Sequence, residues 1–182
     1  MKNEIDILRD VSKKLRSAGI DFMLTGSVAM SYYAQPRMTR DIDIVLSLGR
    51  ASVDTIVNVF ADDYYLSTEA VLDAILRGSM FNAIHLESVI KVDLIVLPDT
   101  SFARSEFGRK STVRIGDFET TIISREDLIL SKLLWAKNSG SEMQIRDVRN
   151  LLSGPCDREY LRKWAEDLNI TETMEGLLNS DE

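Results

Sequence analysis

The chain has 182 residues, 45% of them hydrophobic, and a formal net charge of −7 at pH 7. This length supports one substantial core with a small appended helical segment and leaves little room for two independent domains. The acidic charge argues against a broad basic surface that would hold duplex nucleic acid nonspecifically, although a local basic patch is compatible with it.

Hydrophobic periodicity predicts helices that alternate with strands over the first two thirds of the chain. Gly19 and Pro36 mark two helix ends, because glycine suits a helix C-terminus and proline cannot continue a helix. Thr68 is the predicted cap of a later helix. In chain order, the predicted elements are helix 3–17, strand 20–25, helix 28–34, strand 41–48, helix 52–60, strand 64–66, helix 69–77, strands 80–86 and 89–97, helix 102–109, and strands 113–115 and 119–123.

From Ser124 onward the pattern is helical. Ser124 to Asp127 resemble a capping box, and a leucine-rich helical face follows up to Lys137. The expected architecture is therefore an α/β (α+β) core with a mixed β-sheet over residues 1–123, flanked by helices and followed by a helical C-terminal segment over 124–182 packed on that core. The further predicted helices of this segment are 142–152, 158–168 and 173–178.

The sequence shows no apolar run long enough to span a bilayer and no signal-peptide pattern at its N-terminus, so a cytoplasmic protein without a membrane partner is expected. The single cysteine, Cys156, cannot form an intrachain disulfide. The single histidine, His85, lies in an alternating strand without a G-x-S-x-G elbow, which favours a structural role. Trp135 and Trp164 lie at helical positions that favour core or helix–helix contacts.

Two acidic residues share one face of the predicted strand 41–48. A strand projects alternate side chains to the same side, so Asp41 and Asp43 point together while Ile42 and Ile44 face the core. Two carboxylates aimed at one point repel each other, and burial raises their pKa unless a cation or several donors compensate. Magnesium is a natural compensator, since it takes oxygen ligands and is commonly shared with substrate phosphates. The pattern indicates a metal site that handles a nucleotide.

The dipeptide Gly26-Ser27 stands before this strand, between a predicted strand and a predicted helix. A phosphate at this turn would meet free amide groups at a helix N-terminus, with no Cβ on Gly26 to block it and the Ser27 hydroxyl as a further donor. Asp93 is a lone charge in a later β-branched strand, which requires an explanation. If that strand lies beside the strand of Asp41, Asp93 becomes the third carboxylate of a two-metal site.

These residues also have ordinary structural explanations. Glycine and serine are common in a strand-to-helix turn for conformation and capping alone. Asp41 could form an ion pair with Arg37 or Arg40 at the start of its strand. The two arginines could equally steer a phosphate or neutralise the aspartates. Asp93 has the weakest structural explanation, because Lys91 is the only obvious cation near it in the sequence.

The ordered set of Gly26-Ser27, Asp41-Ile42-Asp43 and Asp93 resembles the motifs of nucleotidyltransferases of the DNA polymerase beta superfamily. The resemblance covers residues 20–97, and more loosely the helices up to residue 152. It implies a nucleotidyltransferase core and the transfer of a nucleoside monophosphate from an NTP such as ATP to a hydroxyl, with pyrophosphate released. Across the family the acceptor is a small molecule, a tRNA end or a protein side chain, and the choice stays open.

A closer resemblance is to minimal nucleotidyltransferases related to AbiEii-type toxins, through Arg37-Met38-Thr39 before the Asp-x-Asp motif. Lys132 and the pair Arg146-Asp147 resemble a helical lysine and a basic-acidic pair of these relatives. From the residues alone, Lys132 also fits a lysine that extends along leucines to solvent, and Arg146-Asp147 fits a solvated helical face.

The resemblance implies roles at the matched positions, with Mg²⁺ or Mn²⁺ as cofactor. Asp41, Asp43 and Asp93 are the expected catalytic metal ligands, and the expected phosphate contacts are Gly26, Ser27, Arg37 and Lys132. The acidic charge and small size also motivate a second hypothesis. In that hypothesis the chain is a non-catalytic or regulatory toxin–antitoxin module that keeps the fold and binds an antitoxin-type protein.

Overall fold

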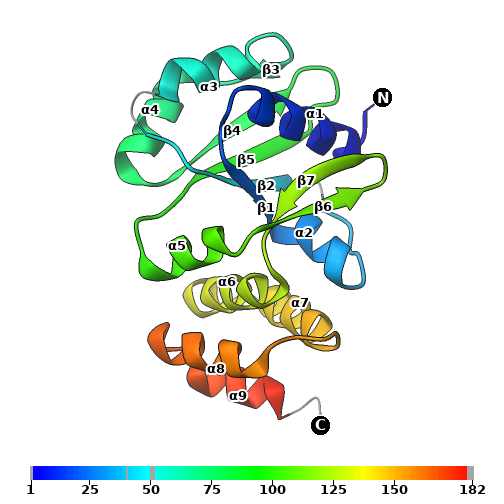
Figure 1. Cartoon of the computed structure of the whole chain (residues 1–182), viewed down its shortest axis with the longest axis vertical. Coiled ribbons are helices and arrows are strands. Elements are labelled where there is room, and N and C mark those ends of the chain that lie inside the picture. Colours follow the sequence, from blue (N-terminus) through cyan, green and yellow to red (C-terminus); the bar gives the residue numbers. More distant parts are fainter. Residues whose placement is uncertain (1, 40, 50–51, 180–182) are drawn as a thin grey trace.

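The computed structural model describes residues 2–39, 41–49 and 52–179. In this part of the chain seven strands form one mixed sheet in the order β3-β4-β5-β2-β1-β7-β6. Helices flank the sheet, so the mixed α+β architecture expected from the sequence is confirmed (Figure 1). The elements are α1 (Glu4–Ser17), β1 (Phe22–Thr25), α2 (Gly26–Tyr33), β2 (Asp41–Leu46), α3 (Val53–Phe60), β3 (Tyr64–Tyr65), α4 (Thr68–Arg77), β4 (Met80–His85), β5 (Lys91–Val96), α5 (Ser101–Gly108), β6 (Ser111–Ile115), β7 (Phe118–Ile122), α6 (Arg125–Ser139), α7 (Glu142–Leu152), α8 (Arg158–Asp167) and α9 (Thr171–Leu178).

Strand β2 lies at the centre of the sheet, antiparallel to β1 and parallel to β5. Both β2 and β5 consist mainly of β-branched and leucine residues, which suit strands that are covered on both faces. Ile42, Ile44 and Leu46 are fully buried on one face of β2. The alternation of side chains therefore directs Asp41 and Asp43 to the opposite face.

The four C-terminal helices α6 to α9 lie together below the sheet in the view of Figure 1, next to α2 and α5. Arg125 at the start of α6 joins this segment to the core, because its guanidinium donates to the backbone oxygen of Tyr33 at 2.7 Å and to that of Leu151 at 2.9 Å. Buried residues of both regions belong to one continuous hydrophobic core. The division of the chain at residue 124 stays a prediction.

Some local predictions differ from the structure. The cap of α4 is Ser67 and not Thr68, because the Ser67 hydroxyl accepts from the Ala70 amide at 3.2 Å. Ser124 caps α6 by accepting from the Asp127 amide, but the Asp127 carboxylate does not return to the cap backbone; it accepts from Ser124 Oγ, Arg109 and Tyr160 instead. Of the two hydrogen bonds of a capping box, α6 therefore has only the one from the Asp127 amide to the Ser124 hydroxyl.

The predicted roles of the histidine and the tryptophans meet different outcomes. His85 is buried and its Nδ1 accepts from the Ser88 amide, so its predicted structural role is confirmed. Trp164 packs edge-on against Phe102, as predicted. Trp135 is 57% exposed, so of the two predicted roles, core or helix–helix contact, the core role is wrong for this residue. No helix in the described residues is both long and apolar enough to cross a membrane.

The central position of β2 makes the burial of Ile44 a test of this fold. Ile44 is fully buried at the middle of the sheet, so the substitution Ile44→Ala should lower the free energy of unfolding by about 2–5 kcal/mol. Urea denaturation of both proteins measures the difference. Met38→Ala is the control, because Met38 is 92% exposed and its truncation should change stability by less than about 0.5 kcal/mol. Equal losses for the two variants would contradict the topology.

Candidate active site

The pairing of β2 with β5 brings together the three predicted acidic residues. Asp43 lies directly opposite Asp93 in the parallel register, and Asp41 lies opposite Lys91. Residues paired in this way present their side chains to the same face of a sheet. On the other side of β5, Asn82 of β4 is paired with Asp93. We call Asp41, Asp43 and Asp93 the acidic row. The sequence predicted these three residues, but not Asn82.

Gly26 lies against the carboxylate of Asp43. Thr25 is paired with Asp43 across β1 and β2, so the turn that follows β1 runs beside this carboxylate. A Cβ atom on Gly26 would lie 2.0 Å from Asp43 Oδ2, and the Gly26 φ angle of +67° also favours glycine. Only glycine therefore allows the turn and the carboxylate to come this close.

The N-terminus of α2 is open for an anion. Its N-cap residue, Thr25, makes no side-chain capping hydrogen bond. First-turn amides of a helix lack intrahelical partners and attract negative charge. The Ser27 hydroxyl oxygen accepts from Arg37 Nη2 at 2.6 Å, which leaves the Ser27 proton free to donate. The predicted phosphate turn thus has donors next to the acidic row.

The charge of the acidic row is only partly compensated. Burial, followed by the negative charges of Asp93 and Asp41, raises the pKa of Asp43 to about 6. Asp93 is better compensated, since it accepts from Asn82 Nδ2 and from Lys91 Nζ, the latter at 3.0 Å. A partly buried group of carboxylates, whose oxygens can serve as metal ligands, is the environment that a hard divalent cation prefers.

The acidic side chains are not gathered around one point. Among the residues that the structure describes, no group of three or more His, Cys, Asp or Glu side chains already has a metal-ligating arrangement. Asp41 and Asp93 instead contact the Lys91 ammonium, with Asp41 Oδ1 at 3.6 Å from Nζ. The carboxylate oxygens of Asp41, Asp43 and Asp93 fit magnesium or manganese in their chemistry.

Arg37 and Lys132 meet at a buried carboxylate of the helical segment, Asp147. Arg37 Nε and Nη2 donate to the two oxygens of Asp147 at 3.0 and 3.1 Å, and Lys132 Nζ donates to Asp147 Oδ2 at 2.7 Å. Lys132 also donates to Gln144 Oε1 at 3.1 Å. Arg37 and Lys132 thus share the single negative charge of Asp147 beside Ser27. These three residues form a basic cluster that keeps a surplus positive charge.

The alternatives left open for these basic residues now have structural answers. Lys132 is only 3% exposed and does not extend to solvent, and burial lowers its pKa. Arg37 pairs with Asp147 and not with Asp41, whose cation is Lys91. Arg40 lies outside the described residues.

A cavity of about 510 Å³ joins the acidic row to the basic cluster. Its floor continues from the acidic row along β2 and β5 to Val45 and Ile95, and helices α5, α6 and α7 contribute its remaining walls. Trp135 and the half-exposed Met143 add large apolar side chains to the lining. The predicted site residues that line it are Gly26, Ser27, Arg37, Asp41, Asp43, Asp93 and Lys132.

A buried acid in the wall of this cavity was not predicted from the sequence. Glu106 of α5 is 8% exposed and accepts a hydrogen bond from the Ser131 hydroxyl of α6. Burial raises its pKa to about 7. The sequence signal was present, because Glu106 lies beside the buried Phe107 and three to four residues after the buried Phe102 and Ala103.

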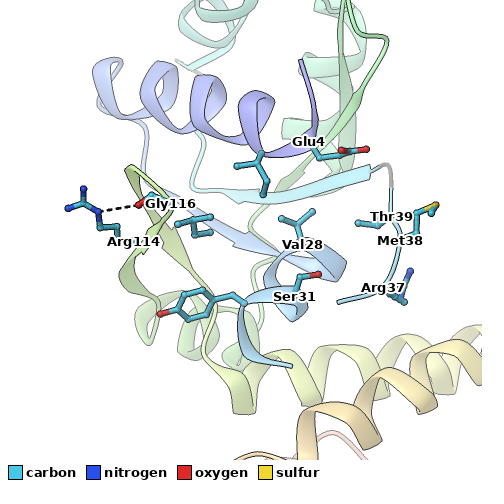
Figure 2. Close-up of a pocket in the computed structure, with 11 residues that line it drawn as sticks. Glu4, Val28, Ser31, Arg37, Met38, Thr39, Arg114 and Gly116 are labelled. Atoms are coloured by element: carbon cyan, nitrogen blue, oxygen red, sulfur yellow. Dashed lines mark hydrogen bonds between the residues drawn. The ribbon is translucent and has the colours of Figure 1, made fainter. Parts of the chain in front are cut away.

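A second hollow of about 570 Å³ also touches Arg37 and Thr39. Figure 2 shows it between α1, α2 and the turn of the β6–β7 hairpin, with Val28 and Ser31 of α2 at its centre and Arg114 directed toward the Gly116 carbonyl. Among the described residues that line it, the only acidic one is Glu4. Because it lacks a group of carboxylates, the hollow at the acidic row is the better candidate for metal-dependent chemistry.

Comparison with known proteins identifies relatives of the fold. No protein-family model and no curated protein sequence matches the chain. Among solved structures, a nucleotidyltransferase-like protein of Paracoccidioides brasiliensis is 18% identical with a TM-score of 0.56, over 82% of this chain and 76% of that chain. The lincosamide antibiotic adenylyltransferase LnuA, with lincomycin bound, is 16% identical with a TM-score of 0.57, over 84% of this chain and 99% of that chain.

Two further structures agree with these. A putative nucleotidyltransferase of Thermotoga maritima is 16% identical with a TM-score of 0.54, over 78% of this chain and 90% of that chain. The antibiotic-resistance factor ANT(2'')-Ia is 12% identical with a TM-score of 0.52, over 98% of this chain and 92% of that chain. At these identities the likeness concerns the fold, and the chain has the fold of nucleotidyltransferase-like proteins.

The contact between Gly26 and Asp43 generates the first prediction for the site. The substitution Gly26→Ala should weaken Mn²⁺ binding by about tenfold or more, because the new Cβ displaces the carboxylate. Titration with Mn²⁺, followed through the electron paramagnetic resonance signal of the free ion, measures this affinity. Gly78→Ala is the matched control, since Gly78 also has a positive φ angle but has open space around its Cβ position. Equal effects in both variants would show that strain alone matters.

The raised pKa of Glu106 generates a prediction for stability. The folded protein holds the Glu106 proton up to about pH 7, whereas the reference carboxyl loses it near 4.5. Stability from this group is therefore present at low pH and lost as the pH rises through about 7. Glu106→Gln should raise the free energy of unfolding by about 1–3 kcal/mol at pH 8 and leave it unchanged near pH 4.

Urea denaturation at the two pH values checks this expectation. Glu119→Gln, at an exposed acidic residue of β7, is the control and should show no such pH dependence. A difference between Glu106→Gln and the parent protein that is the same at both pH values would contradict the role of the buried charge.

Proposed function

We propose that the protein is a metal-dependent nucleotidyltransferase, which transfers a nucleoside monophosphate from an NTP to a hydroxyl. The observation that carries this proposal is the juxtaposition of Asp43 and Asp93 across β2 and β5, with the open N-terminus of α2 beside them. Carboxylates that bind metal and amides that bind phosphate are the two parts that phosphoryl-group transfer requires.

The triphosphate would lie along the turn at Gly26. The amides at the start of α2 and the Ser27 hydroxyl would hold its β- and γ-phosphates. The basic cluster adds the surplus charge of Arg37 and Lys132, which Asp147 holds in place. Lys132 is thus a proposed phosphate contact with only part of its hydrogen-bonding capacity available, since its ammonium already donates to two protein acceptors.

The acidic row would hold the divalent metal that such a reaction uses. Asp41, Asp43 and Asp93 are the proposed ligands, and Mg²⁺ or Mn²⁺ bound there would lower the pKa of the attacking hydroxyl and neutralise charge on the phosphates. Asn82 fixes one oxygen of Asp93. The other oxygen accepts from Lys91, and once that contact is released it could take the proton of the acceptor hydroxyl.

The proposed transfer forms one bond and breaks one bond at the α-phosphorus of the NTP. The acceptor oxygen forms a bond to the α-phosphorus, the bond from that phosphorus to the bridging oxygen breaks, and pyrophosphate leaves. The acceptor proton passes to Asp93 or to solvent. Among acceptors, we propose a small-molecule hydroxyl, because the structural neighbours include the lincomycin-bound LnuA and a complex of ANT(2'')-Ia with adenylyl-2''-tobramycin. The same adenylyltransferase neighbours make ATP the first NTP to test, and a cytoplasmic site of action fits this donor.

A transfer assay tests the proposal. The protein is incubated with Mg²⁺, each α-labelled NTP and a panel of hydroxyl-bearing antibiotics and RNAs, and both label transfer and pyrophosphate release are measured. Asp43→Asn should reduce transfer by about 10²-fold or more, since it removes a negative ligand with little change in shape.

Asp117→Asn is the matched control, because Asp117 is an exposed aspartate that pairs with Arg9 away from the cavity. Transfer that survives in Asp43→Asn would reject the catalytic role of the acidic row. Calorimetry that detects no binding of any NTP with Mg²⁺ would reject nucleotide transfer altogether and would favour the partner-binding hypothesis.

A further inference from the structure

Lys91 places a permanent cation inside the acidic row. It lies two residues before Asp93 on β5 and directly opposite Asp41 on β2, so all three side chains share one face of the sheet. Its Nζ lies 3.0 Å from Asp93 Oδ2 and 3.6 Å from Asp41 Oδ1. One ammonium thus contacts two of the three carboxylates that the proposed function gives to the metal.

This cation divides the three carboxylates unequally. Both oxygens of Asp93 are engaged, one by Lys91 and the other by Asn82, and one oxygen of Asp41 faces Lys91. The carboxylate of Asp43 has no hydrogen-bond or ion-pair partner within the described part of the chain, although Asp43 is the most central of the three. The ammonium therefore satisfies the two flanking carboxylates and leaves the central one exposed to an incoming cation.

The position of Lys91 conflicts with simultaneous binding of a metal by Asp41 and Asp93. A metal that takes both carboxylates would lie close to the ammonium, because Lys91 already contacts an oxygen of each, and two neighbouring cations repel each other strongly. The same contacts fit the finding that the acidic side chains of the described residues are not gathered into a metal-ligating group.

We propose that Lys91 is a resident counter-ion that competes with the divalent metal for Asp41 and Asp93. In the free protein it neutralises the acidic row and keeps the affinity for metal low. Metal then binds well only together with the nucleotide, whose phosphates supply further oxygen ligands and extra negative charge. This inference rests on the metal site of the proposed function.

Metal titration in the absence of nucleotide tests the competition directly. The full chain, Lys91→Met and Lys91→Arg are titrated with Mn²⁺ near neutral pH, and the free ion is followed by electron paramagnetic resonance. Lys91→Met should bind Mn²⁺ about tenfold more tightly than the parent chain, because a competing unit charge is removed. Lys91→Arg keeps the charge and should retain the weak binding of the parent chain.

A second titration measures the coupling to nucleotide. A non-hydrolysable ATP analogue should increase the Mn²⁺ affinity of the parent chain, and the increase should be smaller in Lys91→Met. Lys110→Met is the matched control, since Lys110 also forms an ion pair of 3.1 Å with an aspartate, but that aspartate, Asp21, is not one of the three proposed metal ligands. It should behave like the parent chain in both titrations.

The outcomes separate this inference from the proposed function. Mn²⁺ affinity that is unchanged or weaker in a folded Lys91→Met protein would overturn the role of Lys91, while nucleotide-dependent metal binding by the parent chain would leave the proposed function intact. Tighter binding in Lys91→Met that disappears when Asp43→Asn is added supports both. If no variant binds Mn²⁺ with or without the analogue, both proposals fail.

Discussion

The parallel pairing of β2 with β5 is the constraint on which the site depends. It places Asp43 beside Asp93 in the middle of a sheet, where burial and mutual repulsion raise the pKa of Asp43. Two carboxylates on directly paired residues require positive charge or hydrogen-bond donors to compensate their repulsion. The surrounding contacts compensate this charge only in part: Lys91 and Asn82 satisfy Asp93, whereas the Asp43 carboxylate lies directly against Gly26. The site remains short of positive charge at Asp43, its central carboxylate, and this is the physical basis of the proposed metal site.

The helical segment contributes the opposite charge to the same cavity. Asp147 of α7 is buried, and it joins Arg37 from the loop before β2 to Lys132 of α6. Burial of a carboxylate is costly without partners, and here two cations supply them. The ion pairs therefore connect the segment to the turn at Ser27, in addition to the apolar core that both regions share. The segment takes part in building the cavity, and it does more than cover the sheet.

The sequence revealed the parts of the site that follow from local periodicity. Alternation along a strand was sufficient to place Asp41 and Asp43 on one face, and a lone acid in an apolar strand identified Asp93. That β5 lies next to β2 in the sheet could only be assumed, because the order of strands is set by contacts between residues distant in the sequence. For Asp147 the sequence leaves two interpretations open, the basic-acidic pair of the resembling family and a solvated helical face, where helical charges usually lie. The spacing of Asp147 from the buried Gln144 and Leu151 was the available sign that it faces inward.

The two charged walls of the cavity together define what it can bind well. The acidic row needs a cation, and the basic cluster and the open end of α2 need an anion. A bare metal ion would satisfy the first wall but would be repelled by Lys91, and a bare triphosphate would satisfy the second wall but would be repelled by the carboxylates. A metal–nucleotide complex carries both charges in one ligand and is complementary to both walls. We therefore propose that the distribution of charge in the protein favours the complex over either of its components, through Lys91 and Asp147 as much as through the three aspartates.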